Sequence, residues 1–234
     1  MTAAVSTSPY TYKPSPYSSH TLMLQSIPKD GAASRVLDLG CTGGYLSSIL
    51  VERGFQVVGI DLPGSTLGDF PEGGRFLEAD LDAGLPELPS RFEFVLCGDV
   101  LEHLKNPLQM LLQIHEVLTP GGILIASLPN SGHWYFRLNV LAGRFPAEDR
   151  GLFDRTHLHF YTWNGWTDLF ARAGFTFSHV SPTATPFSLA FPGTPLPARL
   201  LESLSYRVAR IRKTLFAYQF VVVARPAAPE GEAH

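Results

Sequence analysis

The chain contains few cysteines and no long apolar run. Its 234 residues include only two cysteines, Cys41 and Cys97, and their separation matches no metal-binding motif. No apolar run approaches the roughly 18 to 20 residues needed to cross a bilayer, and residues 1–19 lack the apolar core of a signal peptide. We therefore expect a cytoplasmic protein with no transmembrane segment, in which both cysteines are free thiols.

An excess of charge of one sign is also absent. The sequence has 18 Lys and Arg residues against 21 Asp and Glu, a formal net charge of -3 at pH 7. Nothing in this balance favours nucleic acid as a partner. The 45% hydrophobic and 17% charged content is typical of a folded globular chain, and the length suits one large α/β domain without repeats.

Apolar runs of strand length alternate along the chain with stretches of helical periodicity. This βαβ rhythm predicts a mostly parallel sheet with helices on both faces. Asn106 and Pro107 form a good start for one of the helices, and the sequence TPGG at 119–122 ends it. The seven predicted strands cover residues 35–40, 55–61, 74–80, 92–98, 121–129, 175–181 and 218–225.

Composition divides the chain into one domain and two flanks. Residues 1–18 and 226–234 are rich in small, polar and proline residues, so we expect both to be flexible around a domain at 19–225. After the fifth strand, residues 129–165 form an insertion rich in aromatic residues and histidine that is too long for a simple connection. We expect it to form a lid over a ligand together with residues 183–215.

A glycine-rich turn lies between the first strand and the next helix, in the sequence VLDLGCTGGYLSSILVERGF at 36–55. In such a turn, backbone amides and a helix N-terminus meet a ligand at close range, which predicts a nucleotide-like ligand. The dinucleotide-binding motif would require a glycine at Thr42 and does not ask for an acid at Asp38, so a nicotinamide cofactor is disfavoured.

An ordered series of motifs extends this pattern over about residues 20–182. Asp38-x-Gly40-x-x-x-Gly44 follows the first strand, Asp61 and Asp80 follow the second and third, and FEFVLCGDVLEHL at 92–104 contains the fourth. The series resembles the class I S-adenosylmethionine-dependent methyltransferases, which implies a Rossmann-like seven-stranded fold. Within the resemblance, Thr42 departs from the glycine that the family usually has.

The resemblance also implies where the cofactor, S-adenosyl-L-methionine, binds. The turn from Gly40 to Gly44 would lie beside its methionine part, Asp61 would hold the ribose hydroxyls, and Asp80 would face the adenine amino group. A carboxylate suits the ribose because it accepts two hydroxyl hydrogen bonds. The implied cofactor-binding residues are Asp38, Gly40, Cys41, Thr42, Gly44, Asp61, Asp80, Leu81 and Gly98.

The sequence GDVLEHLKNP at 98–107 raises two alternatives. On a helix, Asp99, Glu102 and His103 would share a face and form a metal or acid/base site, yet an acid three residues before Glu is also an ordinary capping box. We expect Asp99 to cap while Glu102 and His103 face the ligand. The carboxyl end of the fourth strand is where open α/β sheets bind ligands.

DVLEHL also looks like two methyltransferase groups, those of ubiquinone biosynthesis that methylate oxygen and those that methylate the 3'-terminal ribose of small RNAs. In the RNA group an acid-x-x-Glu-His run and a later histidine bind a divalent metal. Carried over, the ligands of a Mg2+ ion would be Asp99, Glu102 and His103 with either His157 or His159. Without a metal, His103 would be the general base, with Glu102 and His157 as further catalytic residues.

The later sequences SLPNSGHWYFRLNVLAGRFP and DRTHLHFYT are similar to a bacterial branch that includes the MetW proteins of methionine biosynthesis. They supply the residues expected in the lid or acceptor wall. These are His133, Trp134, Tyr135, Arg137, Arg144, Asp154, Arg155, His157, His159 and Tyr161.

A basic stretch precedes the last strand. It contains Arg199, Arg207, Arg210, Arg212 and Lys213, and a solvated helix face is favoured over contact with an anionic substrate or membrane.

These patterns predict methyl transfer to a hydroxyl of a small metabolite or sugar by in-line displacement, in which the protein mainly positions the reactants. Two alternatives stay open. One is a MetW-like accessory protein that binds a biosynthetic partner enzyme such as a homoserine acyltransferase. The other is an RNA ribose methyltransferase, which the acidic net charge disfavours.

Overall fold

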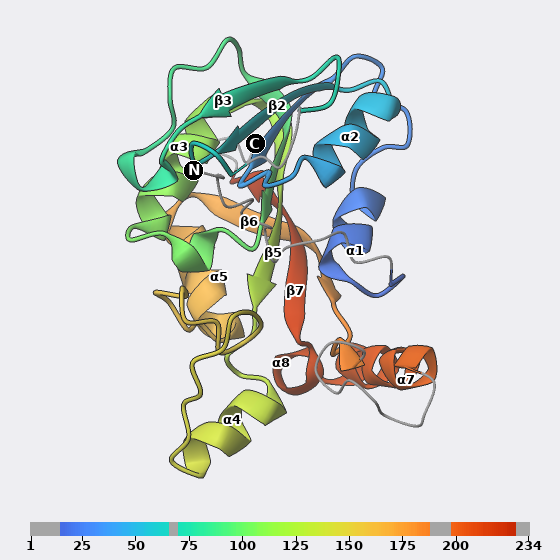
Figure 1. Cartoon of the computed structure of the whole chain (residues 1–234), viewed down its shortest axis with the longest axis vertical. Helices are drawn as coiled ribbons and strands as arrows, with labels where there is room; N and C mark the ends of the chain where they lie inside the picture. Colours follow the sequence, from blue (N-terminus) through green and yellow to red (C-terminus); the bar gives the residue numbers. More distant parts are fainter. Residues whose placement is uncertain (1–14, 66–69, 188–197, 228–234) are drawn as a thin grey trace, which may run out of the picture.

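The computed structural model describes residues 15–65, 70–187 and 198–227. Its centre is one seven-stranded sheet in the order β3-β2-β1-β4-β5-β7-β6 (Figure 1). β1 to β5 pair in parallel, whereas β7 is antiparallel to β5 and β6. The strands are β1 Arg35–Leu39, β2 Gln56–Asp61, β3 Arg75–Glu78, β4 Phe92–Gly98, β5 Leu118–Pro129, β6 Phe175–Pro182 and β7 Gln219–Pro226. The predicted mostly parallel sheet is confirmed.

Helices cover both faces of the sheet, as predicted. On one face lie α1, Ser19–Gln25, and α2, Tyr45–Glu52; on the other lie α3, Pro107–Val117, and α5, Trp163–Arg172 (Figure 1). Alternate strand residues feed the two cores: Val36 packs with the α1 and α2 side, and Leu37 packs with the α3 and α5 side. Because both faces are buried, the strands are continuous apolar runs without polar alternation.

The predicted start of α3 is confirmed. The side chain of Asn106 accepts a hydrogen bond from the amide of Gln109 at 3.1 Å, and Pro107 occupies the first helical position. The helix ends at Val117, and β5 follows directly at Leu118, three residues earlier than residue 121, where the sequence pattern places it.

The two predicted lid segments contain helices beyond the carboxyl end of β5. Residues 129–165 include α4, Trp134–Leu141, and residues 183–215 include α7, Ala198–Ile211, and most of α8, Lys213–Phe216. α4 and α7 lie at the same end of the molecule (Figure 1). The closing of these helices over a ligand stays a prediction.

The structure describes only part of the two predicted flanks. Residues 1–14 and 228–234 lie outside the described residues. Residues 15–18 are anchored on α7, because Ser15 donates a hydrogen bond to Glu202 at 2.8 Å and the ring of Tyr17 stacks on that of Tyr206. At the other flank, β7 extends to Pro226, one residue into the predicted tail.

Candidate active site

The glycine loop turns sharply between β1 and α2. Gly40, Thr42 and Gly44 all have positive φ, at 66°, 47° and 68°. A Cβ at Gly40 would lie 2.5 Å from the side chain of Val100, so this position requires glycine on two grounds. Thr42 adopts a conformation that is unfavourable for a β-branched residue. Its amide donates a hydrogen bond to the carboxylate of Asp61 at 2.6 Å, which stabilises the turn.

Asp61 therefore joins the glycine loop to the end of β2. One carboxylate oxygen accepts from Thr42, and the other accepts from the amide of Leu62 at 2.7 Å. Each carboxylate oxygen has a second lone pair, so Asp61 can still accept hydrogen bonds from a ligand.

Asp38 lies beneath the loop and is buried. Its carboxylate accepts a hydrogen bond from the hydroxyl of Ser47 in α2 at 2.6 Å. Burial raises the pKa of Asp38 from its usual value near 3.8 to about 7, although the bond from Ser47 opposes that shift, and the charge of Asp61 adds to it. A cation bound nearby would restore the ionised form.

The other predicted cofactor-binding residues surround the same edge of the sheet. Asp80 follows β3, and its side chain accepts from the amide of Asp82 at 2.9 Å, which caps the short 3-10 turn that contains Leu81. Gly98 ends β4. Cys41 is buried, and its sulfur would lie 2.8 Å from a Cβ added at Gly59. Cys41 and Cys97 are both free thiols, as predicted.

Glu102, His103 and His157 form a cluster on the acceptor side. Each offers one potential ligand atom, and these atoms lie within 4.8 Å of one another. Nε2 of His157 is 3.9 Å from Oε1 of Glu102, and the ring centroids of His103 and His157 are 4.7 Å apart. Glu102 is buried, and its Oε2 has no hydrogen-bond partner. The cluster therefore presents an unsatisfied buried oxygen beside two imidazoles.

Burial keeps two members of this cluster neutral. Desolvation raises the pKa of Glu102 well above its usual range, and the charge of Asp99 adds to the effect. Desolvation also lowers the pKa of His157 to about 4, with a further contribution from His103. A cation among these groups would oppose the effect of burial on Glu102, because it favours the charged carboxylate, and would reinforce the effect on His157, because it favours the unprotonated imidazole.

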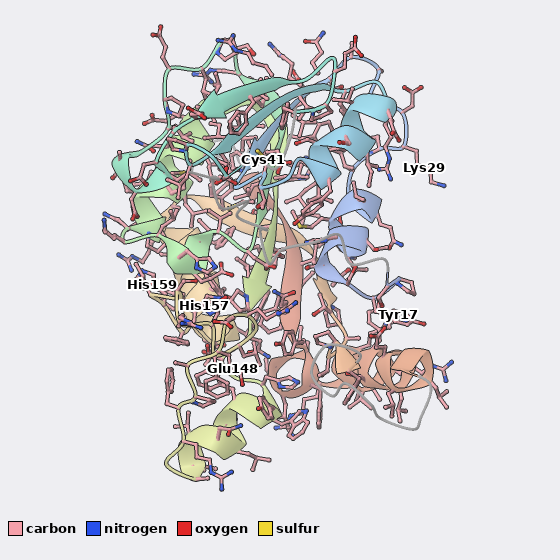
Figure 2. All side chains as sticks on the ribbon, in the orientation of Figure 1. Tyr17, Lys29, Cys41, Glu148, His157 and His159 are labelled. Carbon is pink, nitrogen blue, oxygen red and sulfur yellow. The ribbon has the colours of Figure 1, made fainter. Side chains whose placement is uncertain are left out.

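Backbone hydrogen bonds bring the cluster together. Glu102 and His103 lie in a 3-10 turn, Leu101–His103, directly after β4. The carbonyl of Glu102 accepts from the amides of Leu158 at 2.8 Å and His159 at 3.2 Å, which holds the segment before α5 against this turn. Figure 2 shows His157 and His159 on that segment.

The two alternative histidines take different places. His157 belongs to the cluster, whereas Nε2 of His159 is hydrogen-bonded to the carbonyl of Leu104 at 2.9 Å. The ring of His159 also stacks on that of Tyr161.

Nδ1 of His103 is 3.2 Å from the carbonyl of Thr156. It also lies 3.0 Å from the hydroxyl oxygen of Thr156, whose own proton is donated to Asp154 at 2.6 Å. Both oxygens of Thr156 can therefore accept from Nδ1, and a proton on Nδ1 would leave the Nε2 lone pair available.

Asp99 lies outside the cluster, and the expectation that it caps a helix is wrong. The 3-10 turn begins after Val100 without a side-chain cap. With φ at 56°, Asp99 turns toward neighbouring strands, where its carboxylate accepts from Ser127 at 2.5 Å and from Gln219 at 2.8 Å. No local motif marks Ser127 or Gln219, because they reach Asp99 only through the sheet order β4-β5-β7.

Several residues of the predicted acceptor wall make structural contacts. Buried His133 caps α4 by accepting from the amide of Tyr135 at 3.3 Å, and burial lowers its pKa to about 4. Asp154 is buried and accepts from Thr156, and Arg137 donates to the carbonyl of Gly132 at 2.7 Å.

The remaining wall residues divide between ring contacts and the surface. Arg155 forms a surface ion pair with Asp149, and Arg144 is exposed. Tyr135 and Tyr161 pack edge-on against Phe153 and Trp166.

In the basic stretch, the side chain of Arg199 lies outside the described residues. Arg207, Arg210 and Arg212 are exposed, and Lys213 lies over the ring of Trp163 at 4.1 Å.

The fold and the order of these motifs are those of the class I, Rossmann-like S-adenosylmethionine-dependent methyltransferases, and the candidate site lies at the carboxyl ends of β1 to β4. The chain belongs to a methyltransferase family whose model, described as a methyltransferase domain, matches residues 17–180.

Relatives and solved structures agree with this class. The ubiquinone biosynthesis O-methyltransferase of Leptothrix cholodnii is 31% identical over 119 residues, which cover 47% of this chain and 51% of that protein. The chain thus spans about half the length of the curated relatives it matches.

Two solved structures have the same fold. A methyltransferase from Mesorhizobium loti is 21% identical with a TM-score of 0.60, and 89% of this chain covers 98% of it. The magnesium protoporphyrin IX methyltransferase of Synechocystis, solved with bound SAH, is 18% identical with a TM-score of 0.56. In that comparison 88% of this chain covers 78% of the other.

Proposed function

We propose that the protein transfers the methyl group of S-adenosylmethionine to a hydroxyl oxygen of a small acceptor. The observation that carries this proposal is the cluster of Glu102, His103 and His157 beside the carboxyl end of β4. A hydroxyl that attacks the methyl carbon must lose a proton, and this cluster supplies groups that can take it. The curated relatives, named as O-methyltransferases of ubiquinone biosynthesis, support the same choice of atom.

The cofactor is proposed to bind along the carboxyl edge of the sheet. The loop from Gly40 to Gly44 would contact its methionine part, Asp61 would accept from the ribose hydroxyls, and Asp80 would face the adenine. Asp38 would become negatively charged next to the cationic sulfonium and ammonium groups, because a nearby cation lowers its pKa from about 7.

His103 is proposed as the proton acceptor. With its Nδ1 proton donated to Thr156, Nε2 would carry the lone pair that receives the acceptor proton. The reaction needs the acceptor oxygen, the methyl carbon and the sulfur in line, and the residues around the cluster would hold that alignment.

The same cluster also fits a divalent metal ion. Two imidazoles and one carboxylate, with the second carboxylate oxygen unpartnered, match the donor set of Zn2+, Mn2+ or Fe2+. Mg2+, which the sequence resemblance implies, prefers oxygen ligands and suits this set less well. A bound ion of this kind would lower the pKa of an acceptor hydroxyl. Glu102, His103 and His157 would hold it, and Asp99 would not.

Replacement of His103 tests the role in proton transfer. For His103→Ala we expect the rate of methyl transfer from labelled S-adenosylmethionine to phenolic or sugar acceptors to fall about 100-fold to 10,000-fold. Its affinity for the demethylated cofactor should stay within about twofold, because His103 lies on the acceptor side. His179→Ala, at an exposed position on β6, is the matched control. Unchanged turnover in His103→Ala would remove His103 from the chemistry.

Metal analysis of the purified chain tests the second role. After incubation with Zn2+, Mn2+ or Mg2+ and desalting, we expect Zn2+ or Mn2+ to be retained by the wild type and by His179→Ala. The variants Glu102→Gln and His157→Ala should lose it. If the wild type retains none of these ions, the metal role is withdrawn and metal-free proton transfer is the proposal that is left.

The accessory-protein and RNA alternatives gain no specific support. The cluster lacks the Asp99 ligand that the RNA-type motif implies.

A further inference from the structure

The outward side of α7 carries exposed aliphatic residues. Leu200, Leu204 and Ile211 are 61%, 58% and 86% exposed. Their spacing of four and seven residues places them on one side of the helix. Residues on the opposite side, such as Ala209, are buried against the domain. Helix α7 is therefore apolar both toward the domain and toward solvent.

The charges on this outward side are all positive. Arg207 lies among the exposed aliphatic residues, and Arg210 and Arg212 are also exposed. The only acid within Ala198–Ile211 is Glu202, which is buried and bonded to Ser15.

Helix α4 and the residues that follow it, 142–145, repeat the pattern at the same end of the molecule (Figure 1). Leu138, Leu141 and Phe145 are 56%, 84% and 57% exposed. Arg137 and Arg144 are exposed beside them, and Trp134–Leu141 contains no acid.

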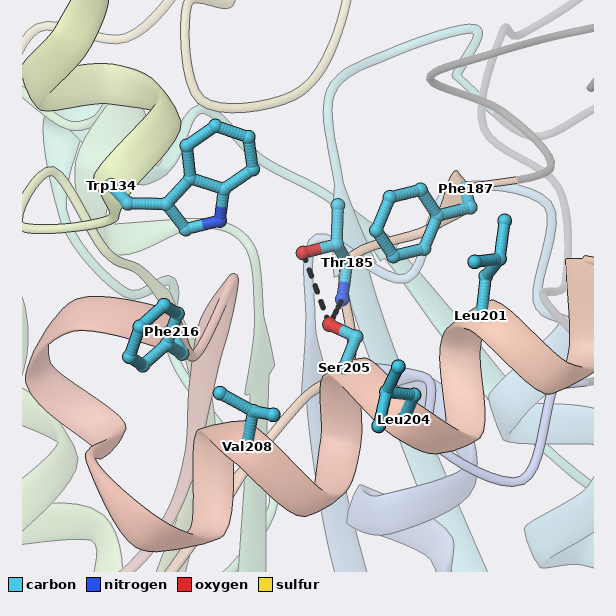
Figure 3. Close-up of a pocket in the computed structure, with 8 residues that line it drawn as sticks. All are labelled: Trp134, Thr185, Phe187, Leu201, Leu204, Ser205, Val208 and Phe216. Atoms are coloured by element: carbon cyan, nitrogen blue, oxygen red, sulfur yellow. Dashed lines mark hydrogen bonds between the residues drawn. The ribbon is translucent and has the colours of Figure 1, made fainter.

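An apolar groove of about 190 Å³ lies between the two helices. Trp134 of α4, Val208 of α7 and Phe216 of α8 line it, and Figure 3 shows their side chains directed toward the same space. Leu204 also lines the groove, so the groove is continuous with the exposed aliphatic residues of α7.

We propose that this end of the molecule docks on the surface of a membrane that contains anionic lipids. We call it the docking face. It comprises Leu138, Leu141, Phe145, Leu200, Leu204 and Ile211 with Arg137, Arg144, Arg207, Arg210 and Arg212.

Charge complementarity selects this occupant. Exposed aliphatic side chains next to arginines are the features with which interfacial helices enter the headgroup region of anionic bilayers. No acidic side chain of α4 or α7 would face the anionic lipids, because Glu202 is buried. None of the helices in the described part of the chain could cross a membrane.

Docking would bring the mouth of the groove, at Leu204, to the hydrocarbon boundary of the bilayer. On the proposed function, an acceptor with an apolar tail would then be presented to the protein at this face. The docking itself does not depend on that function, since lipid binding needs no methyl transfer.

Flotation of the full chain with vesicles tests the proposal. We expect binding to phosphatidylcholine vesicles that contain about 30% phosphatidylglycerol and no binding to phosphatidylcholine alone, because each arginine near an anionic surface adds attraction. Raising NaCl from about 0.1 to 1 M shortens the screening length from about 10 to 3 Å and should release the protein.

Two double variants separate charge from apolar contact. Arg207→Glu/Arg210→Glu should lower the vesicle partition coefficient at least about thirtyfold, because two attractive charges are replaced by two repulsive ones. Leu200→Ser/Ile211→Ser should lower it at least about tenfold, because exposed aliphatic contacts are lost. The matched controls Arg75→Glu and Leu112→Ser change exposed residues on β3 and α3 and should bind as the wild type does.

Thermal unfolding and binding of the demethylated cofactor would show that each variant is folded. If the folded wild type does not bind anionic vesicles, the proposal is overturned. Equal binding to neutral vesicles, or equal losses in the control variants, would also overturn it. Each of these results leaves the proposed methyl transfer to be judged by its own assay.

Discussion

At the scale of single residues, Asp38 couples the stability of the domain to pH. Its pKa of about 7 in the folded protein lies above its usual value near 3.8, mainly because it is buried. Between these two values the unfolded chain releases a proton that the folded chain keeps. The stability that Asp38 contributes is therefore fully present below pH 3.8 and is lost as the pH rises through about 7.

Asp38→Asn removes this titratable carboxyl group. It is predicted to flatten the pH dependence of the free energy of unfolding. Between pH 4 and 7.5 the free energy of unfolding of the variant should rise relative to the wild type. The total change is up to about 4 kcal/mol, because each tenfold difference in proton affinity between the folded and unfolded chains corresponds to roughly 1.4 kcal/mol. Urea unfolding without cofactor at several pH values measures it. Asp30→Asn, at an exposed side chain, gives the baseline, and parallel curves for wild type and Asp38→Asn would contradict the prediction.

Also at this scale, Glu102 shows how a buried acid differs from an ordinary one. Its Oε2 makes no hydrogen bond, and burial raises its pKa, which favours the neutral acid. An unsatisfied buried polar atom costs about 1 to 3 kcal/mol. Because Glu102 lowers the stability of the fold, a role in binding a ligand explains its presence at this position better than a structural role does.

At the scale of elements, the glycine loop depends on its contact with the end of β4. Gly40 has a φ of 66°, and the side chain of Val100 lies 2.5 Å from the position that a Cβ of residue 40 would take. Gly40→Ala is predicted to combine two costs, the left-handed conformation at about 1 to 2 kcal/mol and the clash with Val100. Both should displace the loop and weaken binding of the demethylated cofactor.

A double-mutant cycle separates these two costs. Gly40→Ala/Val100→Ala removes the clash and keeps the conformational cost, so it should be more stable than the sum of the two single variants predicts. Urea unfolding of the four proteins measures the coupling. Strict additivity would show that Val100 does not restrict the loop.

The acceptor-side cluster is also built at the level of elements. A 3-10 turn after β4 supplies Glu102 and His103, and a segment more than fifty residues later supplies His157. Two amide hydrogen bonds to the carbonyl of Glu102 join them. Changes in the segment before α5 would therefore alter the cluster even when they leave its three side chains intact.

At the scale of the whole molecule, the cofactor is predicted to stabilise the fold. At about 100 times its dissociation constant, a ligand that binds only the folded chain adds roughly 2.7 kcal/mol, which corresponds to several degrees for a domain of this size. We expect this change in thermal unfolding with either S-adenosylmethionine or its demethylated product. Asp61→Asn should reduce the stabilisation, and Asp168→Asn, at an exposed position on α5, should not. An unchanged unfolding temperature at millimolar cofactor would contradict the proposed site.

Local patterns were sufficient for most of the fold. The apolar runs at 35–40 and 92–98, the cap at Asn106 and the glycine turn all depend on neighbours in sequence, so the strands and α3 follow from them. The interior of a parallel sheet demands such continuous apolar strands, and few other folds do. The class of methyltransferase and its cofactor were implied by the resemblance of this ordered motif series to a known family.

Contacts between distant segments were decided only by the tertiary structure. The pattern around GDVLEHLKNP left a helix cap and a metal or acid/base site as alternatives, because both need the same residues at the same spacing. The sheet order then turned Asp99 toward Ser127 and Gln219, and the docking of the segment before α5 selected His157 over His159. Burial, which determines the protonation of Glu102 and His157, exists only once these segments have packed together.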